Sequence, residues 1–147
     1  MPLYLTALIA GLTALLDQIS KHFLKDASSV LLPGLIHLRG VRNTGAAFSL
    51  FSQLPWLIPL LSAALTAGLV WYMLRKRPKG LMGVGLALLL GGAAGNLIDR
   101  LRLGYVVDFI ELSFIPFPIF NLADVAVVAG CGLLALSILF PREAAHA

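Results

Sequence analysis

The 147 residues are 59% hydrophobic and only 12% charged, and the mean hydropathy is +0.93. This composition lies outside the usual range of soluble globular domains and suits a protein surrounded by lipid. The formal charge of +4 does not indicate a nucleic-acid-binding protein, because four of the eleven basic residues are clustered in the short segment 75–79.

Four apolar stretches are long enough to cross a bilayer, which takes about 20 residues. We expect helices at about 3–24, 55–74, 81–101 and 120–140, within a single membrane-embedded domain of residues 1–147. The expected fold class is an all-α polytopic membrane protein. The basic segment 75–79 lies between the second and third helices, so the positive-inside rule places it and both termini on the cytoplasmic side.

The first predicted helix carries an acidic and a basic residue four positions apart. Asp17 and Lys21 share one face, and the acid precedes the base, which is the favourable orientation for an ion pair. Ionisable residues near a membrane are costly unless they are paired. We therefore expect an ion pair, and we favour this role for Asp17 over direct catalysis.

The two longer connections, which the same rule puts outside, hold basic residues that the rule does not explain. They are Lys21, Lys25, Arg39, Arg42, Arg100 and Arg102. These residues bind anionic lipid headgroups or acidic partners, or they have structural roles near a site. In the first connection the loose mixture of apolar and polar residues over 34–42 allows a few short strands.

The third predicted helix is rich in glycine, and Gly91 and Gly95 form a GxxxG pattern. Such a pattern lets a second helix backbone approach closely, so we interpret these glycines as packing residues. Asn96 and Arg100 share a face near the end of this helix, with Asp99 between them. We expect a structural polar network there.

Two further aspartates have different surroundings. Asp108 lies within the apolar run 105–110, where burial favours the neutral form of a carboxyl group. Asp124 follows Asn121 by three residues at the start of the last helix, which predicts a capping pair. Two such aspartates, if brought together, can act as general acid and general base, as in aspartic proteolysis. These residues alone leave open whether the two meet.

Other chemistries find little support in the sequence. The three histidines have no metal-ligand spacing with another His, Cys or Glu, and there is no P-loop or dinucleotide-binding fingerprint. We therefore expect no metal and no cofactor. Cys131 is the single cysteine and lies within the last span, where we expect it to be buried.

Two alternatives to a protease are a small membrane carrier and a membrane lipid transferase. A carrier would need polar residues through the middle of its spans, and these spans have almost none. A transferase would need a histidine or arginine constellation, which the sequence does not contain.

Four segments resemble the motif blocks of lipoprotein signal peptidase, the bacterial type II signal peptidase. They are residues 42–49 (RNTGAAFS), 91–100 (GGAAGNLIDR), 106–109 (VVDF) and 120–124 (FNLAD). Asp17 with Lys21 resembles the first block of that family. The blocks occur in the family's order from the first helix to the last.

This resemblance implies an aspartic endopeptidase with four transmembrane helices, a small extracytoplasmic β-sheet cradle and an extracytoplasmic loop. The expected substrates are diacylglyceryl-modified prolipoproteins, cleaved just before the lipidated cysteine. The other implied partners are membrane lipids and inhibitors of the globomycin type, with no nucleic acid. The implied location is the bacterial cytoplasmic (inner) membrane, with the active site toward the extracytoplasmic face.

The resemblance also assigns residues. The catalytic pair is Asp108 and Asp124, since these match the aspartates of the VVDF and NxAD blocks. The substrate-binding or supporting positions are Asp17, Lys21, Asn43, Gly92, Asn96, Asp99, Arg100, Val106, Asn121 and Ala123. Of these, we expect Asp99 to act as a support paired with basic neighbours.

Overall fold

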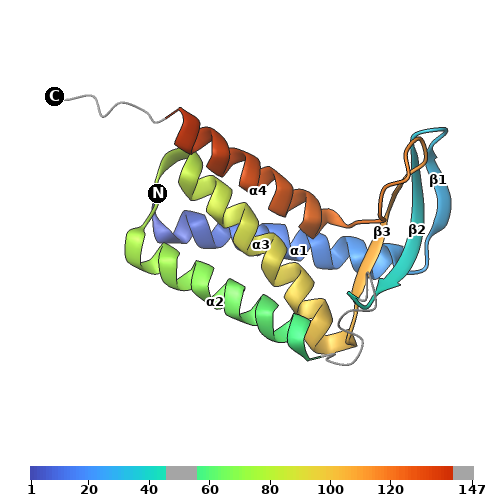
Figure 1. Ribbon diagram of the computed structural model, residues 1–147, viewed down its shortest axis with the longest axis horizontal. Coiled ribbons are helices and arrows are strands. Elements are labelled where there is room, and N and C mark those ends of the chain that lie inside the picture. Colours follow the sequence, from blue (N-terminus) through green and yellow to red (C-terminus); the bar gives the residue numbers. More distant parts are fainter. Residues whose placement is uncertain (46–55, 141–147) are drawn as a thin grey trace.

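The computed structural model describes residues 1–45 and 56–140. Four helices are present in this part of the chain: α1 (Leu3–Leu24), α2 (Leu57–Lys76), α3 (Gly80–Leu103) and α4 (Leu122–Leu139). All four are long and apolar enough to cross a membrane, and they lie side by side as a bundle (Figure 1). Their bounds differ from the predicted ones by at most two residues.

Local signals explain where the helices end. Arg77, directly before Pro78, ends α2 in a left-handed conformation with φ of 45°. Gly104 ends α3 with φ of 79°, and its N–H donates to the carbonyl of Arg100. The last helix starts at Leu122 because Asn121 and Asp124 form the predicted capping box. The predicted start of the second helix, residue 55, lies outside the described residues.

Helix α3 is the centre of the bundle and packs against α1, α2 and α4. Its glycines allow this close approach. A side chain on Gly91 would meet Thr13 and the backbone of Ala10 in α1, and one on Gly92 would meet the carbonyl of Ala123 in α4. The prediction that these glycines serve close packing is confirmed.

The outer surfaces of the helices expose many large apolar side chains, as expected of surfaces that face lipid. The inner apolar core of the bundle is small and is formed around Met73, Leu86 and Ala87. Cys131 is exposed on α4, so the prediction that it is buried is wrong. A weakly polar thiol can face lipid as readily as the protein interior, so an apolar span does not determine its orientation.

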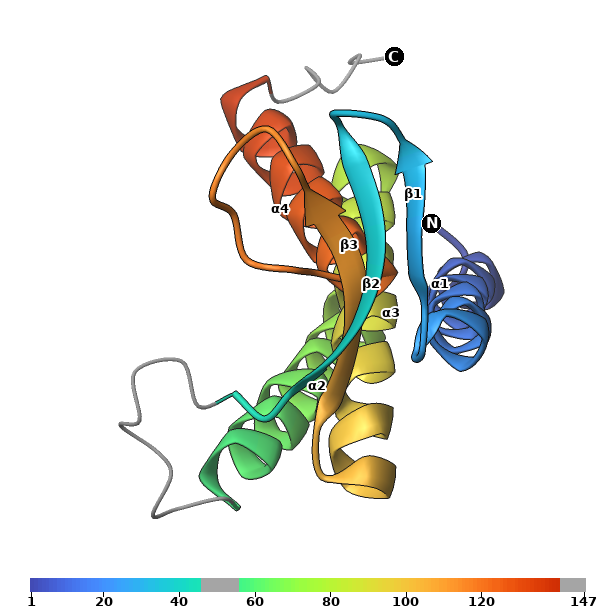
Figure 2. The same ribbon diagram turned by 90° about the vertical axis from the view of Figure 1, so that its right-hand side faces the viewer.

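One end of the bundle carries a three-stranded antiparallel sheet in the order β1 (Ser28–Leu32), β2 (Ile36–Asn43), β3 (Val106–Leu112) (Figures 1 and 2). Strands β1 and β2 both lie in the first connection, where short strands are expected, and β2 covers most of the run 34–42. We did not predict β3 from its residue pattern. Its first four residues are all buried, so the alternation of a half-buried strand is missing.

The opposite end of the bundle holds the α2–α3 connection and the N-terminus. The amino group of Met1 donates to the carbonyl of Pro78 at 3.1 Å. The sheet therefore lies far from the basic segment 75–79, with the four helices between them (Figure 1).

Candidate active site

Asp108 lies in β3 and is buried, with 3% of its surface exposed. Two neutral amides hold its carboxylate: Asn43 Nδ2 donates to Oδ2 at 2.8 Å, and Asn121 Nδ2 donates to Oδ1 at 2.6 Å. Burial raises the pKa of this carboxyl, the negative charge of Asp124 raises it further, and the two amide donors oppose the rise. The net effect is a pKa of Asp108 above the ordinary value for aspartate.

The sheet register places Asn43 beside Asp108. Asn43 of β2 is opposite Val106 of β3, and Asp108 lies two residues further along the same face. The amide is also oriented, because the N–H of Gly45 donates to Asn43 Oδ1 at 2.8 Å. With its oxygen engaged in this way, Asn43 presents its NH₂ group to Asp108.

Asp124 is the third residue of α4 and belongs to the capping box. Its Oδ2 accepts from the N–H of Asn121 at 3.1 Å, and its own N–H donates to Asn121 Oδ1 at 3.0 Å. The other carboxylate oxygen accepts from Asn96 Nδ2 at 2.8 Å. A helix N-terminus favours negative charge, so this position suits a carboxylate.

Asn121 links the two aspartates and is fully buried. Its side-chain nitrogen reaches Asp108, while its backbone N–H and side-chain oxygen bind Asp124. It also donates to Asn96 Oδ1 at 3.1 Å. The charge of Arg100 acts on both aspartates, and its guanidinium donates to the carbonyl of Asn96 at 3.4 Å.

Asp108 and Asp124 line the same cavity, which has a volume of about 610 Å³. Asn43 is the third polar residue in its wall. The rest of the wall is apolar and is supplied by the segment before α4 and by one face of α4: Phe117, Pro118, Ile119, Phe120, Val125, Val128 and Ala129. Two carboxyl groups thus meet an apolar space at the sheet end of the bundle.

Asp17 and Asp99 belong to a second group, centred on Lys21. The ammonium of Lys21 lies 2.8 Å from Asp17 Oδ2 and 3.1 Å from Asp99 Oδ2, and all three side chains are almost completely buried. The predicted pairing of Asp17 with Lys21 is confirmed. Asp99 is paired with a base from α1 rather than with its neighbours in α3.

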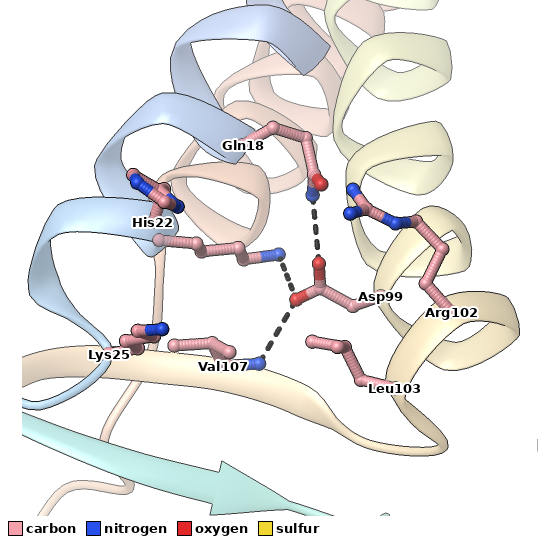
Figure 3. Close-up of a pocket in the computed structure, with 8 residues that line it drawn as sticks. Gln18, His22, Lys25, Asp99, Arg102, Leu103 and Val107 are labelled. Atoms are coloured by element: carbon pink, nitrogen blue, oxygen red, sulfur yellow. Dashed lines mark hydrogen bonds and ion pairs between the residues drawn. The ribbon is translucent and has the colours of Figure 1, made fainter.

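Backbone groups complete this second network. Asp99 Oδ2 also accepts from the N–H of Val107 at 3.0 Å, and Asp17 Oδ1 accepts from the N–H of Ala123 at 2.9 Å (Figure 3 shows the contacts of Asp99). Asp17 and Asp99 thus tie α1 and α3 to the residues that directly precede Asp108 and Asp124. Neither lines the large cavity.

The remaining predicted site residues lie near these groups without lining the cavity. Gly92 packs against Ala123, and Val106 is buried opposite Asn43. Sequence reasoning missed Gln18, whose amide donates to Asp99 at 2.8 Å and to the carbonyl of Gly95 at 3.1 Å. A polar side chain next to Asp17 within an apolar span was the available signal.

Among residues 1–45 and 56–140, no three His, Cys, Asp or Glu side chains come together as a group that could hold a metal ion.

Known proteins resemble this chain over most of its length. The family model described as signal peptidase (SPase) II matches residues 9–140. The lipoprotein signal peptidase of Parasynechococcus marenigrum is 51% identical over 126 residues, covering 81% of this chain and 79% of that protein. That of Lactococcus lactis subsp. lactis is 36% identical over 147 residues, covering 96% of both chains.

Solved structures agree with these relatives. A structure described as a bacterial membrane enzyme superposes with a TM-score of 0.84 at 30% identity, covering 92% of this chain and 93% of that chain. Another with the same description gives a TM-score of 0.81 at 30% identity, covering 91% and 87%. The chain belongs to the signal peptidase II family of aspartic peptidases.

Proposed function

We propose that Asp108 and Asp124 are the catalytic pair with which this aspartic endopeptidase removes the signal peptide from prolipoproteins. The observation that carries the proposal is that both carboxyl groups line one apolar cavity while the same asparagine, Asn121, holds them both. Residues 1–147 form one peptidase domain in this proposal.

The two aspartates take different protonation states at the start of the reaction. Asp108 is neutral, because burial and the charge of Asp124 raise its pKa. Asp124 is the ionised partner, at a helix N-terminus and hydrogen-bonded to Asn96.

Hydrolysis then needs only these two groups and water. Asp124 takes a proton from a water molecule while the oxygen of that water adds to the scissile carbonyl carbon. At the same time Asp108 gives its proton to the carbonyl oxygen. When the carbon–nitrogen bond breaks, Asp124 gives the proton it took from water to the leaving nitrogen, and Asp108 takes a proton from a hydroxyl group of the tetrahedral intermediate, so both carboxyl groups return to their starting states. Turnover falls as pH rises through the pKa of Asp108, since the acid is then lost.

The substrate is a prolipoprotein whose cysteine carries diacylglycerol, cut just before that cysteine. The apolar wall of the cavity, with Phe117, Val125 and Val128, suits a lipid-anchored peptide or its acyl chains. Burial of acyl chain is worth about 0.8 kcal/mol per CH₂, so chain contacts can position the scissile bond with few polar contacts to the peptide. Membrane lipids and inhibitors of the globomycin type are further partners in this proposal.

The enzyme lies in the bacterial cytoplasmic (inner) membrane with both termini in the cytoplasm. Support comes from the basic segment 75–79, from the position of Met1 beside Pro78, and from the even number of spans. The sheet lies at the other end of the bundle (Figure 1), and Asp108 of β3 lines the cavity, so both then face the extracytoplasmic side.

The test is turnover of a lipidated precursor by the purified enzyme in lipid. Asp108→Asn and Asp124→Asn should each lower turnover by at least about 10³-fold, because each removes one of two groups that act as a unit. Asp26→Asn is the control, since Asp26 is exposed just after α1 and has no role in the site. Near-normal turnover by either site variant, in folded protein, would reject the assignment.

A further inference from the structure

A second, smaller pocket of about 190 Å³ opens between the sheet-side ends of α1 and α3 (Figure 3). Its wall consists of Gln18, Lys21, His22, Lys25, Asp99, Arg102, Leu103 and Val107. It shares no lining residue with the cavity of Asp108 and Asp124. Asp99 and Val107 line this pocket but not that cavity, and the catalytic proposal does not account for the pocket.

The pocket has more positive than negative charge. Lys21, Lys25 and Arg102 line it, and Asp99 is the one carboxylate in its wall. Lys21 is already paired with two buried carboxylates. In the described part of the chain, neither Lys25 nor Arg102 lies within 4 Å of a carboxylate oxygen.

The position of the pocket is where a lipid headgroup would lie. Lys25 directly follows the last residue of α1, and Arg102 is in the last turn of α3. The same two helices expose large apolar side chains toward these ends: Ile19 of α1 is 46% exposed and Leu101 of α3 is 68% exposed. A basic recess thus meets a lipid-facing surface at the end of two spans.

Position at a helix C-terminus alone could explain a single cation, because the helix dipole favours positive charge there. The dipoles of α1 and α3 favour a cation at each of these ends, but they do not account for a pocket that these cations line together with the amide of Gln18. A guanidinium and an ammonium around a recess match the chemistry of a phosphate group, which accepts several charge-assisted hydrogen bonds.

We propose that this pocket binds the phosphodiester of an anionic membrane lipid, held by Lys25 and Arg102, with its acyl chains along the apolar surfaces of α1 and α3. Basic pockets between transmembrane helices bind anionic headgroups in this manner. The two cations, which the positive-inside rule does not explain, then have a ligand.

The experiment measures lipid retention by the purified full chain in detergent micelles, using native mass spectrometry. Phosphatidylglycerol is titrated against phosphatidylcholine with identical acyl chains. The wild type should prefer phosphatidylglycerol, and Lys25→Gln/Arg102→Gln should weaken its binding by about 30-fold, the combined effect expected of two basic side chains at a lipid surface.

The matched control is Arg75→Gln/Lys76→Gln, which removes the same charge from exposed positions at the other end of the bundle. It should keep the preference of the wild type. An equal loss of phosphatidylglycerol binding in both double variants would show that any basic side chain attracts the lipid non-specifically, and it would overturn the proposal. So would displacement of phosphatidylglycerol by inorganic phosphate at equal concentration, since the site would then select a free anion rather than a lipid.

This readout does not depend on catalysis, so it can fail while the proposed function stands. A wild type that retains both lipids equally would also overturn the proposal. Both variants should elute from a sizing column as the wild type does, because the replaced side chains are exposed and carry no ion pair within the described residues.

Discussion

The four aspartates at the sheet end of the bundle form two pairs with different partners. Asp17 and Asp99 bind Lys21 and the backbone, and they do not reach the large cavity. Asp108 and Asp124 bind asparagine amides and line that cavity. Asp17, Asp99 and Asp108 are buried and Asp124 is half-buried, so burial alone does not separate the pairs.

The two pairs differ in the charge of the side chains that donate hydrogen bonds to their carboxyl groups. A lysine within 3.1 Å of two carboxylates forms ion pairs that tie both of them to one cation, which suits a structural brace. A neutral amide orients a carboxyl group with less constraint on its protonation, which is what acid–base catalysis requires. Asn96 joins the two groups, because it accepts from Lys21 at 2.8 Å and donates to Asp124.

The largest effect on stability is expected from Lys21→Met. It leaves Asp17 and Asp99 buried without their cation, and breaking a buried ion pair in this way costs about 3–5 kcal/mol. Unfolding in mixed micelles with increasing SDS measures the loss, and Lys76→Met at an exposed position is the control. A variant as stable as the wild type would show that Lys21 is not the centre of the brace.

Asp99→Asn should have a smaller effect. It removes one of the two carboxylates that pair with Lys21, and it removes one of the oxygens that accept from Gln18 and from the N–H of Val107. The free energy of unfolding should fall by about 1.5–3 kcal/mol. Because Asp99 does not line the cavity, turnover should fall by no more than about tenfold, in contrast to Asp108→Asn. Complete loss of turnover in a stable Asp99→Asn protein would place Asp99 with the proposed catalytic pair.

Gly95→Ala tests the close contact between α3 and the brace. A side chain at this position would lie 2.5 Å from Asp17 Oδ2, so overpacking should cost about 1–3 kcal/mol. Gly68→Ala is a matched control in α2, where an added methyl group meets nothing within 4 Å and should slightly stabilise the helix. Equal effects at the two positions would contradict the packing described here.

Several of these features can be predicted from the sequence because the residue patterns that indicate them are local. Apolar length predicted the four spans, the i to i+4 spacing predicted the Asp17–Lys21 pair, and the Asn121–Asp124 spacing predicted the capping box. Each depends on residues that are neighbours along one helix.

The sequence pattern did not determine the long-range contacts. Asp99 was expected to pair with neighbours in α3, but its partner, Lys21, comes from α1. Strand β3 was missed because its first four residues are all buried, and Gln18 was missed because its partners are far away in the chain. The family motifs named Asp108 and Asp124, but only the fold places both carboxyl groups at one cavity.

The most direct test of the central claim is a titration of the carboxyl carbon of Asp108 by ¹³C NMR, with the signal assigned by its absence in Asp108→Asn. We predict a pKa above the ordinary value for aspartate in the wild type, because of burial and the charge of Asp124. In Asp124→Asn the pKa should decrease, since that charge is gone. An Asp108 that titrates at the ordinary value and does not respond to Asp124→Asn would contradict a coupled catalytic pair.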